Sequence, residues 1–404
     1  MVVEIDDIFN SAVNNSLFLN KSVLQTRYNP QSIPHRDEQI KSIASILAST
    51  LRGERPSNLF VYGKTGTGKT LSVQYVCDEL TKKSKEIGVE IRFEYLNCKL
   101  KKVADTEYRI LATLIHQLGG SIPATGLPTD KVWSRFVEMV DDKKQLIVFI
   151  FDEVDQAVKK MNDNFLYSMT RLNQELGNAQ LSIIGISNDV TFLDNIDPRV
   201  RSSLGEEEFV FPPYNAVQLQ DILNDRCSSA FKKGTVSEGV IAKCAAYAAR
   251  EHGDARRALD LLRIAGELSE RDGSKIISEK YIDIANRKME RDKILDIVES
   301  EPKQFQLVLY SIIQLTKQKK KGVLELFFTG DVYNYYQKVC NQLKIDYLTQ
   351  RRISDILAEI DMLGLINAKV ISKGRHGRTR EIKLSIPSNL LDRVESILDE
   401  SLCL

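Results

Sequence analysis

The sequence predicts an α/β protein of three parts: an N-terminal domain built on a parallel sheet, a small all-helical domain and a C-terminal winged helix. Strand-like apolar runs alternate with helical stretches as far as Pro213, which is typical of a parallel sheet covered on both faces. The stretch from Ala216 to Arg287 has helical periodicity and no convincing strand. After Pro302 the order is helix, turn, helix and two alternating strands. The expected domains are residues 1–213, 214–300 and 301–404.

Length and composition fit a globular protein with more than one core. At 404 residues the chain is too long for one core, since domains usually hold about 100–200 residues. The six cysteines include no C-x-x-C pair and the four histidines lie far apart, so neither a zinc site nor a disulfide framework is indicated. No apolar run approaches the ~18 residues of a membrane span, and no leader pattern opens the chain. We therefore expect a cytoplasmic protein with no membrane partner.

Charge is distributed unevenly along the chain. The whole sequence has 56 basic and 55 acidic residues, which excludes a uniformly basic histone-like protein. Between Lys317 and Lys383, however, 14 Lys and Arg stand against 7 Asp and Glu, whereas residues 1–300 have 40 against 43. A polyanionic partner is therefore expected to contact the C-terminal part.

A phosphate-binding loop follows the first predicted strand. An apolar run from Asn58 to Tyr62 precedes a segment that fits G-x-x-x-x-G-K-[ST], and helical spacing follows it. Glycines let backbone N–H groups turn toward phosphate oxygens, Lys69 should reach the β- and γ-phosphates, and the Thr70 hydroxyl should ligate Mg²⁺. The alternative, a glycine-rich turn that binds nothing, is disfavoured by the flanking strand and helix. The loop residues expected to bind ATP or ADP are Gly63, Lys64, Thr65, Gly66, Thr67, Gly68, Lys69, Thr70 and Leu71.

Two carboxylates follow the strongest strand signal. The run from Leu146 to Phe151 ends in Asp152 and Glu153, at the carboxyl edge of the sheet, where ligands of such folds bind. We expect Asp152 to hold Mg²⁺ and Glu153 to orient or deprotonate the attacking water. Asn188, at the end of the next strand, is a candidate for contact with the γ-phosphate or the same water. Asp155 fits a helix cap better than a catalytic role.

Three arginines are candidates for sensing the nucleotide. Arg256 begins a helix of the second domain, from which a guanidinium would reach the γ-phosphate and couple the nucleotide to closure of that domain. A solvated arginine is the alternative. Arg199 and Arg201 follow Asn188 by about one element and are candidates for reaching a neighbouring subunit's nucleotide.

The C-terminal part has two basic elements. An amphipathic helix places polar and basic residues at its N-terminal end, the end that contacts base edges in helix-turn-helix proteins. A hairpin with a basic tip follows, and such a tip suits backbone or minor-groove contact better than base reading. A solvated helix face and a loop kept for solubility are the alternatives. The candidates for DNA contact are Thr349, Gln350, Arg351 and Arg352 on the helix, and Lys373, Arg375, His376, Arg378 and Arg380 on the hairpin.

Five motifs follow one another along nearly the whole chain. They are Tyr-Asn-Pro with Ile-Pro-His-Arg (Tyr28–Arg36), the phosphate loop, Phe-Asp-Glu-Val-Asp (Phe151–Asp155), Asp-Pro-Arg-Val-Arg-Ser-Ser-Leu (Asp197–Leu204) and Gly-Asp-Ala-Arg-Arg-Ala-Leu (Gly253–Leu259). The set resembles the archaeal origin-recognition initiators, AAA+ relatives of the eukaryotic origin recognition complex large subunit and its helicase-loading partner. The last two motifs discriminate far better than the phosphate loop alone.

This resemblance implies an AAA+ base domain, an α-helical lid and a C-terminal winged helix, in a slow ATPase that often retains ADP. It implies double-stranded origin DNA, the replicative helicase and other initiator paralogues as partners, and hence a chromosome-associated protein. It also implies that Ile33, Pro34 and Arg36 lie near the adenine.

The resemblance further implies that residues 106–132 form a helical insertion that touches DNA, for which an ordinary helix hairpin is the alternative. Some relatives have an arginine where Ser203 stands. An arginine acting in trans would therefore be Arg199 or Arg201 here, or be unused.

Three functions are compatible with the sequence. The first is an ATP-regulated initiator that binds double-stranded origin DNA and helps to recruit the replicative helicase. The second is a winged-helix transcription regulator for which nucleotide is only a ligand. The third is an AAA+ ATPase that remodels polypeptides, which the basic winged helix disfavours.

Overall fold

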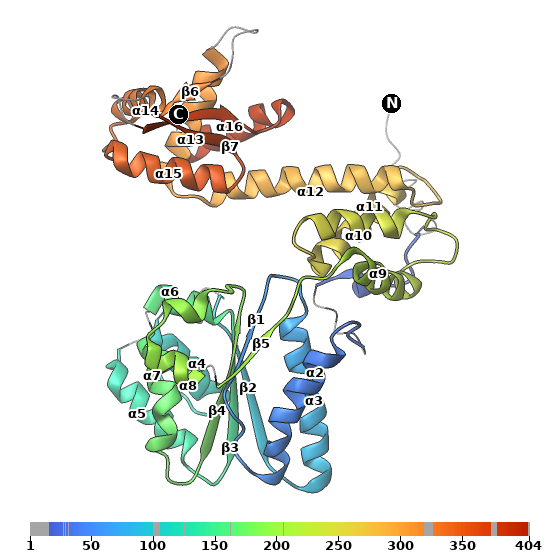
Figure 1. Cartoon of the computed structure of the whole chain (residues 1–404), viewed down its shortest axis with the longest axis vertical. Coiled ribbons are helices and arrows are strands. Elements are labelled where there is room, and N and C mark those ends of the chain that lie inside the picture. The colour runs from blue at the N-terminus through green and yellow to red at the C-terminus, as the bar shows by residue number, and fades with distance from the viewer. Residues whose placement is uncertain are drawn as a thin grey trace. The chain divides into compact units, whose positions relative to one another are not determined.

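The computed structural model describes residues 16–26, 28, 30, 32–99, 106–123, 126–161, 163–204, 206–318, 326–372 and 378–402. The chain divides into two compact units, Met1–Asp283 and Ile284–Leu404. The first contains a parallel sheet and a helical lid, and the second contains the winged helix (Figure 1). Among the described residues, no helix is both long and apolar enough to cross a membrane.

Five parallel strands form the sheet of the first unit, in the order β2-β3-β4-β1-β5. The sequence predicts β1 (Leu59–Tyr62), β3 (Leu146–Asp152) and β4 (Gln180–Ser187), which form the centre of the sheet. It does not predict β2 (Ile91–Asn97) or β5 (Glu207–Val210). Both of these lie at an edge of the sheet, where a strand is less buried and its apolar signal is weaker.

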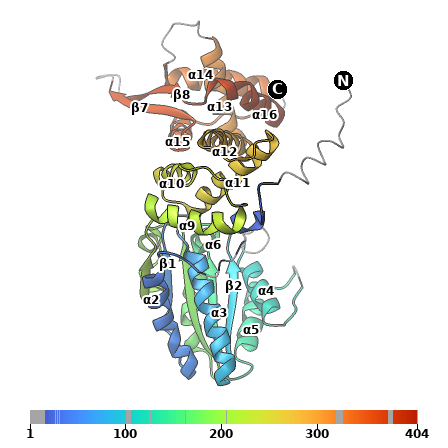
Figure 2. The same ribbon diagram turned by 90° about the vertical axis from the view of Figure 1, so that its right-hand side faces the viewer.

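Helices cover both faces of the sheet (Figure 2). The helices on one face are α2 (Asp37–Leu47) and α3 (Lys69–Ile87), with the short 3₁₀ helix η2 (Ala48–Arg52). Those on the other face are α4 (Glu107–Gln117), α5 (Thr129–Val140), α6 (Val154–Met161), α7 (Asn164–Arg171) and α8 (Pro198–Leu204), with η3 (Leu172–Gln174) and η4 (Phe192–Asn195).

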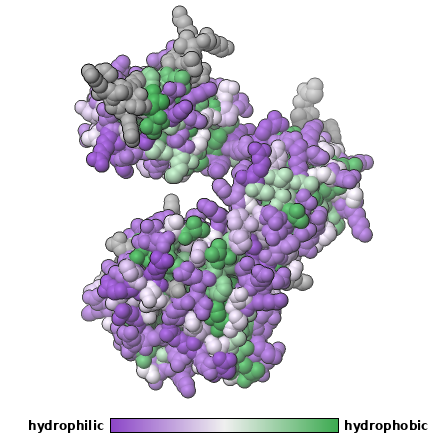
Figure 3. Space-filling model, viewed as in Figure 1, coloured by the Kyte–Doolittle hydropathy of each residue, from purple (hydrophilic) through white to green (hydrophobic). Residues whose placement is uncertain are grey.

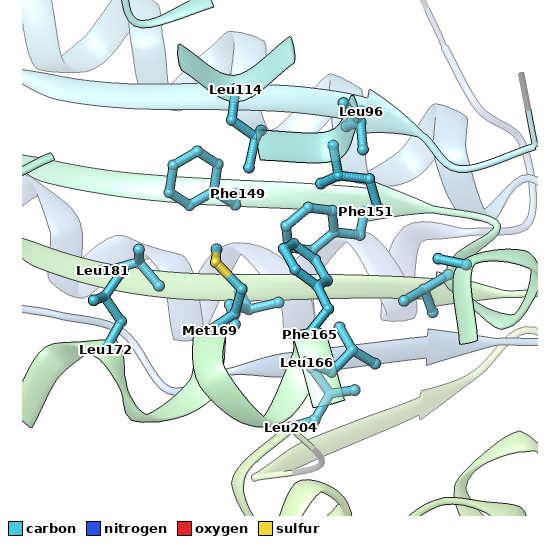
Figure 4. Packing of buried hydrophobic residues seen from close by; sticks show 14 of the residues in the cluster. Leu96, Leu114, Phe149, Phe151, Phe165, Leu166, Met169, Leu172, Leu181 and Leu204 are labelled. Carbon is cyan, nitrogen blue, oxygen red and sulfur yellow. The ribbon is translucent and has the colours of Figure 1, made fainter. Parts of the chain in front are cut away.

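Strand β3 joins the two halves of this core. Because successive side chains of a strand point to opposite faces, Val148 and Ile150 pack with α2 and α3, whereas Phe149 and Phe151 pack on the other face (Figure 4). All seven residues of β3 are buried. Full burial of each such apolar side chain contributes roughly 1.5–3 kcal/mol. The strand that ends in Asp152 is therefore among the most firmly held in the molecule.

The lid is all-helical, as predicted. It consists of α9 (Ala216–Ala230), α10 (Val240–Arg250), α11 (Ala255–Arg271) and the start of α12 (Glu279–Ser300). An N-terminal segment with the 3₁₀ helix η1 (Lys21–Leu24) packs against it. The Phe18 ring lies 4.6 Å from that of Phe231, over Gly266, where a β-carbon would come within 2.6 Å of the Phe18 ring.

The second unit is a winged helix. After α12 come α13 (Lys303–Gln318), β6 (Phe327–Phe328), α14 (Thr329–Leu343), α15 (Gln350–Met362), β7 (Ile366–Ser372), β8 (Arg378–Leu384) and α16 (Ser388–Leu402). The helix, turn, helix and hairpin order confirms the prediction, while β6 and α16 were not predicted. A buried cluster from α12 to α16 forms its core. The face of the molecule seen in Figure 3 is mostly hydrophilic, with a narrow hydrophobic strip on the sheet domain.

Candidate functional site

The phosphate loop opens α3 at the carboxyl edge of the sheet. Gly68 caps this helix with a φ of +89°, and Gly66 has a φ of +72°, the left-handed region that glycine adopts at least cost. Lys69 is 5% exposed, and its amine donates to the carbonyls of Gly63 (2.8 Å) and Lys64 (2.9 Å) and to Asn188 Oδ1 (2.9 Å). Burial lowers the pKa of Lys69 to about 8. The loop thus holds its lysine in a fixed place.

The two carboxylates sit beside this loop. Asp152 Oδ2 accepts hydrogen bonds from the Thr70 hydroxyl (2.9 Å) and from the Tyr95 hydroxyl (2.6 Å). Burial and the neighbouring Asp152 charge raise the pKa of Tyr95, so this phenol stays a donor. Glu153 has a positive φ of 53°, and its carboxylate lies 3.6 Å from the Lys99 amine. A strained backbone at such a position is common at functional sites.

A cavity of about 620 Å³ lies over these groups and is lined by both the sheet domain and the lid. Such a volume suits a ligand of nucleotide size. The predicted residues that line it are Ile33, Pro34, Gly66, Thr67, Gly68, Lys69, Thr70, Leu71, Asp152, Glu153, Asn188 and Arg256. Gly63, Lys64 and Thr65 do not line it, although the carbonyls of the first two hold Lys69.

Arg36 departs from the expectation that it contacts the nucleotide. It does not line the cavity, and it is 2% exposed. Its guanidinium donates to the carbonyls of Thr67 (2.8 Å) and Pro212 (2.6 Å). It therefore supports the phosphate loop from behind, through hydrogen bonds to the protein backbone.

Asp155 also departs from its prediction. It is the second residue of α6 and not its cap, and it is 2% exposed. It accepts a hydrogen bond from the Ser187 hydroxyl (3.0 Å), at the end of β4. This bond joins the helix after β3 to the neighbouring strand.

The lid contributes Arg256 near the start of α11. Asp254 caps this helix and accepts from the Arg256 N–H (2.8 Å), and the Arg256 side chain is exposed and lines the cavity. The lid also contacts the phosphate loop directly, because the Ala255 N–H donates to the Gly66 carbonyl (3.2 Å). The first turn of α11 therefore touches the phosphate loop.

Arg199 and Arg201 lie on α8, away from the cavity lining. Arg199 donates to both oxygens of Asp197 (3.0 and 2.8 Å), and Arg201 pairs with Asp194 (2.9 Å). Hydrogen bonds from Arg199 lower the pKa of Asp197 to about 2. Both arginines are exposed, so a partner subunit would have access to them.

Sequence reasoning missed several residues that line the cavity, among them Tyr95, Asn97 and Arg226, while Tyr28 opens the stretch that the resemblance places near the adenine. Tyr95 and Asn97 lie on β2, and Asn97 pairs in register with Asp152. The alternation of apolar Ile91, Phe93 and Tyr95 with polar residues is a strand signal that would have found them. The guanidinium carbon of Arg226 lies 4.7 Å from the centre of the Tyr28 ring. These two residues are far apart in the sequence, so no local pattern predicts the contact.

The predicted insertion at residues 106–132 is anchored in the core. Its helix α4 buries Ile110, Leu111, Leu114 and Ile115 against the sheet domain. Any contact with DNA would have to come from the remaining faces and loops of this segment.

The basic surface of the winged helix is only partly described. Thr349 caps α15, and Arg351 and Arg352 are exposed on its first turn. Arg380 on β8 is half-buried, and its Nη1 donates to the Ser354 carbonyl on α15 (2.5 Å). A hollow of about 450 Å³ between helix and hairpin is lined by Thr329, Gln350, Arg351, Ser354, Val370, Thr379 and Arg380. Lys373, Arg375 and His376 lie outside the described residues, and Arg378 begins β8.

This combination of parts defines an AAA+ ATPase-type protein with a helical lid and a winged helix. The chain matches the family descriptions "AAA ATPase domain" at residues 32–184, "Cdc6 AAA+ ATPase-type lid domain" at 220–287 and "CDC6, C terminal winged helix domain" at 296–394.

Similar proteins span nearly the whole chain. An ORC1-type DNA replication protein of Pyrococcus furiosus is 48% identical over 391 residues, with 96% of this chain and 91% of the relative covered. The ORC1-type DNA replication protein 1 of Methanosarcina mazei is 47% identical over 384 residues, covering 95% and 91%. The structure of the Aeropyrum pernix ORC1 protein in complex with DNA is similar with a TM-score of 0.83 and 39% identity, covering 95% of this chain and 97% of that one. The chain therefore belongs to the archaeal Orc1/Cdc6 family of DNA replication initiators.

Proposed function

We propose that the protein is an ATP-regulated initiator that binds double-stranded origin DNA and helps to recruit the replicative helicase. The observation that carries the nucleotide part is the network at the carboxyl edge of the sheet. There the Lys69 amine donates to Asn188 Oδ1 and the Thr70 hydroxyl donates to Asp152 Oδ2, each at 2.9 Å, inside a cavity that the lid also lines.

The residues of this site fit a nucleotide with Mg²⁺. A β-carbon at Gly66 would lie 1.7 Å from Asp254, so only glycine allows the loop and the lid helix to meet around the cavity. The Thr70 hydroxyl and the Asp152 carboxylate are the hard oxygen donors that Mg²⁺ prefers. When bound, the cation would neutralise phosphate charge.

Each remaining group has a role in slow hydrolysis. Lys69 binds the β- and γ-phosphates, Glu153 orients or deprotonates the attacking water, and Asn188 fixes that water or the γ-phosphate. Arg256 brings the lid to the γ-phosphate. Arg199 or Arg201 is the candidate for action on another initiator paralogue's nucleotide, once released from its acidic partner.

The DNA part of the proposal rests on the winged helix. The relative from Aeropyrum pernix was solved in complex with DNA. In this chain, Arg351 and Arg352 are exposed at the N-terminal end of α15, and the hairpin adds further positive charge. Such a surface binds the phosphate backbone through charge and base edges through the helix end.

The nucleotide assignment is tested by extraction of bound nucleotide from the purified protein, followed by chromatography. We expect wild type to carry or tightly bind ADP, and Lys69→Ala to lose it while the chain stays folded by circular dichroism. Equal nucleotide content in the two proteins would overturn the assignment of the phosphate loop.

A further inference from the structure

Arg36 is a buried cation that the roles proposed above do not use. It caps α2, just after the Ile-Pro-His segment, and its side chain lies beneath the phosphate loop. The ion pairs of the described residues include none to Arg36, so no carboxylate offsets its charge. Burial lowers the pKa of the Arg36 guanidinium, but arginine stays protonated in proteins. A buried charge of this kind persists only where it is fully hydrogen-bonded.

Backbone carbonyls from three separate segments provide those bonds. Nε donates to the Thr67 carbonyl in the phosphate loop (2.8 Å), and Nη1 donates to the His35 carbonyl (3.2 Å). Nη2 donates to the Pro212 carbonyl (2.6 Å), in the connection between the sheet domain and the lid. The guanidinium carbon also lies 3.9 Å from the centre of the Tyr214 ring and 5.5 Å from that of Phe211.

The same connection contacts the loop and the lid directly. A β-carbon at Gly68 would lie 3.0 Å from the Tyr214 hydroxyl, so the phosphate loop packs closely on this ring. On the lid side, the Tyr214 N–H donates to the Gly253 carbonyl (3.3 Å), and a β-carbon at Gly253 would lie 2.3 Å from the Tyr214 carbonyl oxygen. Gly253 immediately precedes Asp254, the cap of the helix that bears Arg256.

We infer that Arg36 is a positioning residue that links the phosphate loop to residues 212–214, the connection on which the lid turns, called the pivot below. It acts without touching the nucleotide, since it does not line the cavity and each of its three side-chain nitrogens donates to a backbone carbonyl. Its bond to Thr67 fixes the position of the phosphate loop, and its contacts with Pro212 and Tyr214 fix the position of the pivot. Nucleotide in the loop and the position of Arg256 are thereby coupled. This inference rests on the proposed nucleotide site.

Lysine is the informative substitution, because it keeps the charge but offers one compact ammonium in place of a planar fork. It cannot reach the Thr67, His35 and Pro212 carbonyls in the same geometry. We expect Arg36→Lys to weaken the binding of a fluorescent ADP analogue about tenfold, because part of the charge-assisted hydrogen bonding to the loop and the connection is lost. Arg36→Ala should weaken it further, because it removes the charge and all three bonds.

A matched control separates positioning from general loss of stability. Leu47→Ala removes a fully buried side chain from the same helix, α2, in the cluster that packs on the sheet. It should lower the denaturant midpoint as the Arg36 variants do, but leave the affinity for the ADP analogue unchanged.

The second readout is hydrogen exchange of the amides at residues 214–216 and 255–257. In wild type and in Leu47→Ala, ADP should slow exchange at both stretches. In Arg36→Lys held at saturating ADP, this protection of the amides from exchange should be lost, because the bonds that link the phosphate loop to the pivot are gone.

Wild-type affinity and wild-type protection in Arg36→Lys and Arg36→Ala would overturn the inference. Equal loss of affinity in Leu47→Ala would overturn it too, since the effect would then be one of stability. If wild type itself bound no nucleotide and matched Lys69→Ala, the proposed nucleotide site would fail, which is a separate result.

Discussion

The nucleotide site and the basic surface of the winged helix are built in opposite ways. In the first, Lys69 is 5% exposed and has three oxygen partners, and Asp152 is held by two hydroxyls. In the second, Arg352 has a side chain 66% exposed and one ion pair, to Asp355 at 3.7 Å. An exposed pair of this kind contributes about 0–1 kcal/mol. In the nucleotide site, folding alone provides the charged groups with their hydrogen-bond partners. On the basic surface, the charged groups stay exposed to solvent until a binding partner covers them.

This difference predicts how each site fails. A residue of the nucleotide site acts through fixed geometry, so one substitution should remove most of its function. A residue of the basic surface makes one contact among many, so a single substitution should have a graded effect. That effect should depend on salt where a phosphate contact is lost and on DNA sequence where a base contact is lost.

The largest effect is expected from Glu153→Gln. It should leave ADP and ATP binding intact but lower hydrolysis by about 10²-fold or more, because the group that positions or deprotonates water loses its charge. Single-turnover hydrolysis measures the rate, and nucleotide content is the control. Turnover at the wild-type rate would make Glu153 a structural carboxylate.

A smaller effect is expected from Arg352→Ala, which tests whether the helix reads sequence. It should lower the affinity for the specific duplex by about 1–3 kcal/mol and change random-duplex binding little, as for loss of a base contact. Arg393→Ala, an exposed arginine on α16, is the matched control. Equal loss on both duplexes would assign Arg352 to the phosphate backbone.

The hairpin should behave differently from the helix. Arg375→Ala combined with Arg378→Ala should weaken specific and random duplexes in parallel, and should flatten the plot of log affinity against log salt by about two units, because each lost phosphate contact removes about one. Fluorescence anisotropy at several salt concentrations measures both. Unchanged affinity and slope would make the hairpin a solvated loop and would move the DNA surface elsewhere, first to residues 106–132.

The smallest effect is expected from Arg380→Ala, because Arg380 belongs to the basic surface and is also held by a hydrogen bond within the fold. Loss of its bond to the Ser354 carbonyl should lower the free energy of unfolding of the winged helix by about 1–2 kcal/mol. DNA affinity should fall only a few-fold, through a less well fixed hairpin. Chemical denaturation followed by near-ultraviolet circular dichroism tests the first part. An unchanged transition would show that Arg380 serves DNA alone.

The same contrast explains what could be predicted from the sequence. The phosphate loop and Asp152 were found because their positions follow from a local pattern: a buried strand and then a fixed loop. Tyr95 and Asn97 were missed because β2 is an edge strand with a mixed pattern. The resemblance places Arg36 near the adenine, and the sequence does not reveal its burial beneath the loop, because that burial depends on Pro212 and Tyr214, which lie far along the chain. The excess of basic residues predicts the basic surface, but it does not show that the Arg380 guanidinium donates to the Ser354 carbonyl on α15.

Recognition of origin DNA is tested by a genome-wide map of the protein's binding sites, made in cells by crosslinking and sequencing. An initiator that recognises origin DNA should concentrate at a few sites that coincide with the points where replication begins, and Arg352→Ala should lower those peaks relative to the background while leaving the protein on DNA. Binding spread over promoters, with no enrichment where replication starts, would contradict the account and favour a winged-helix transcription regulator.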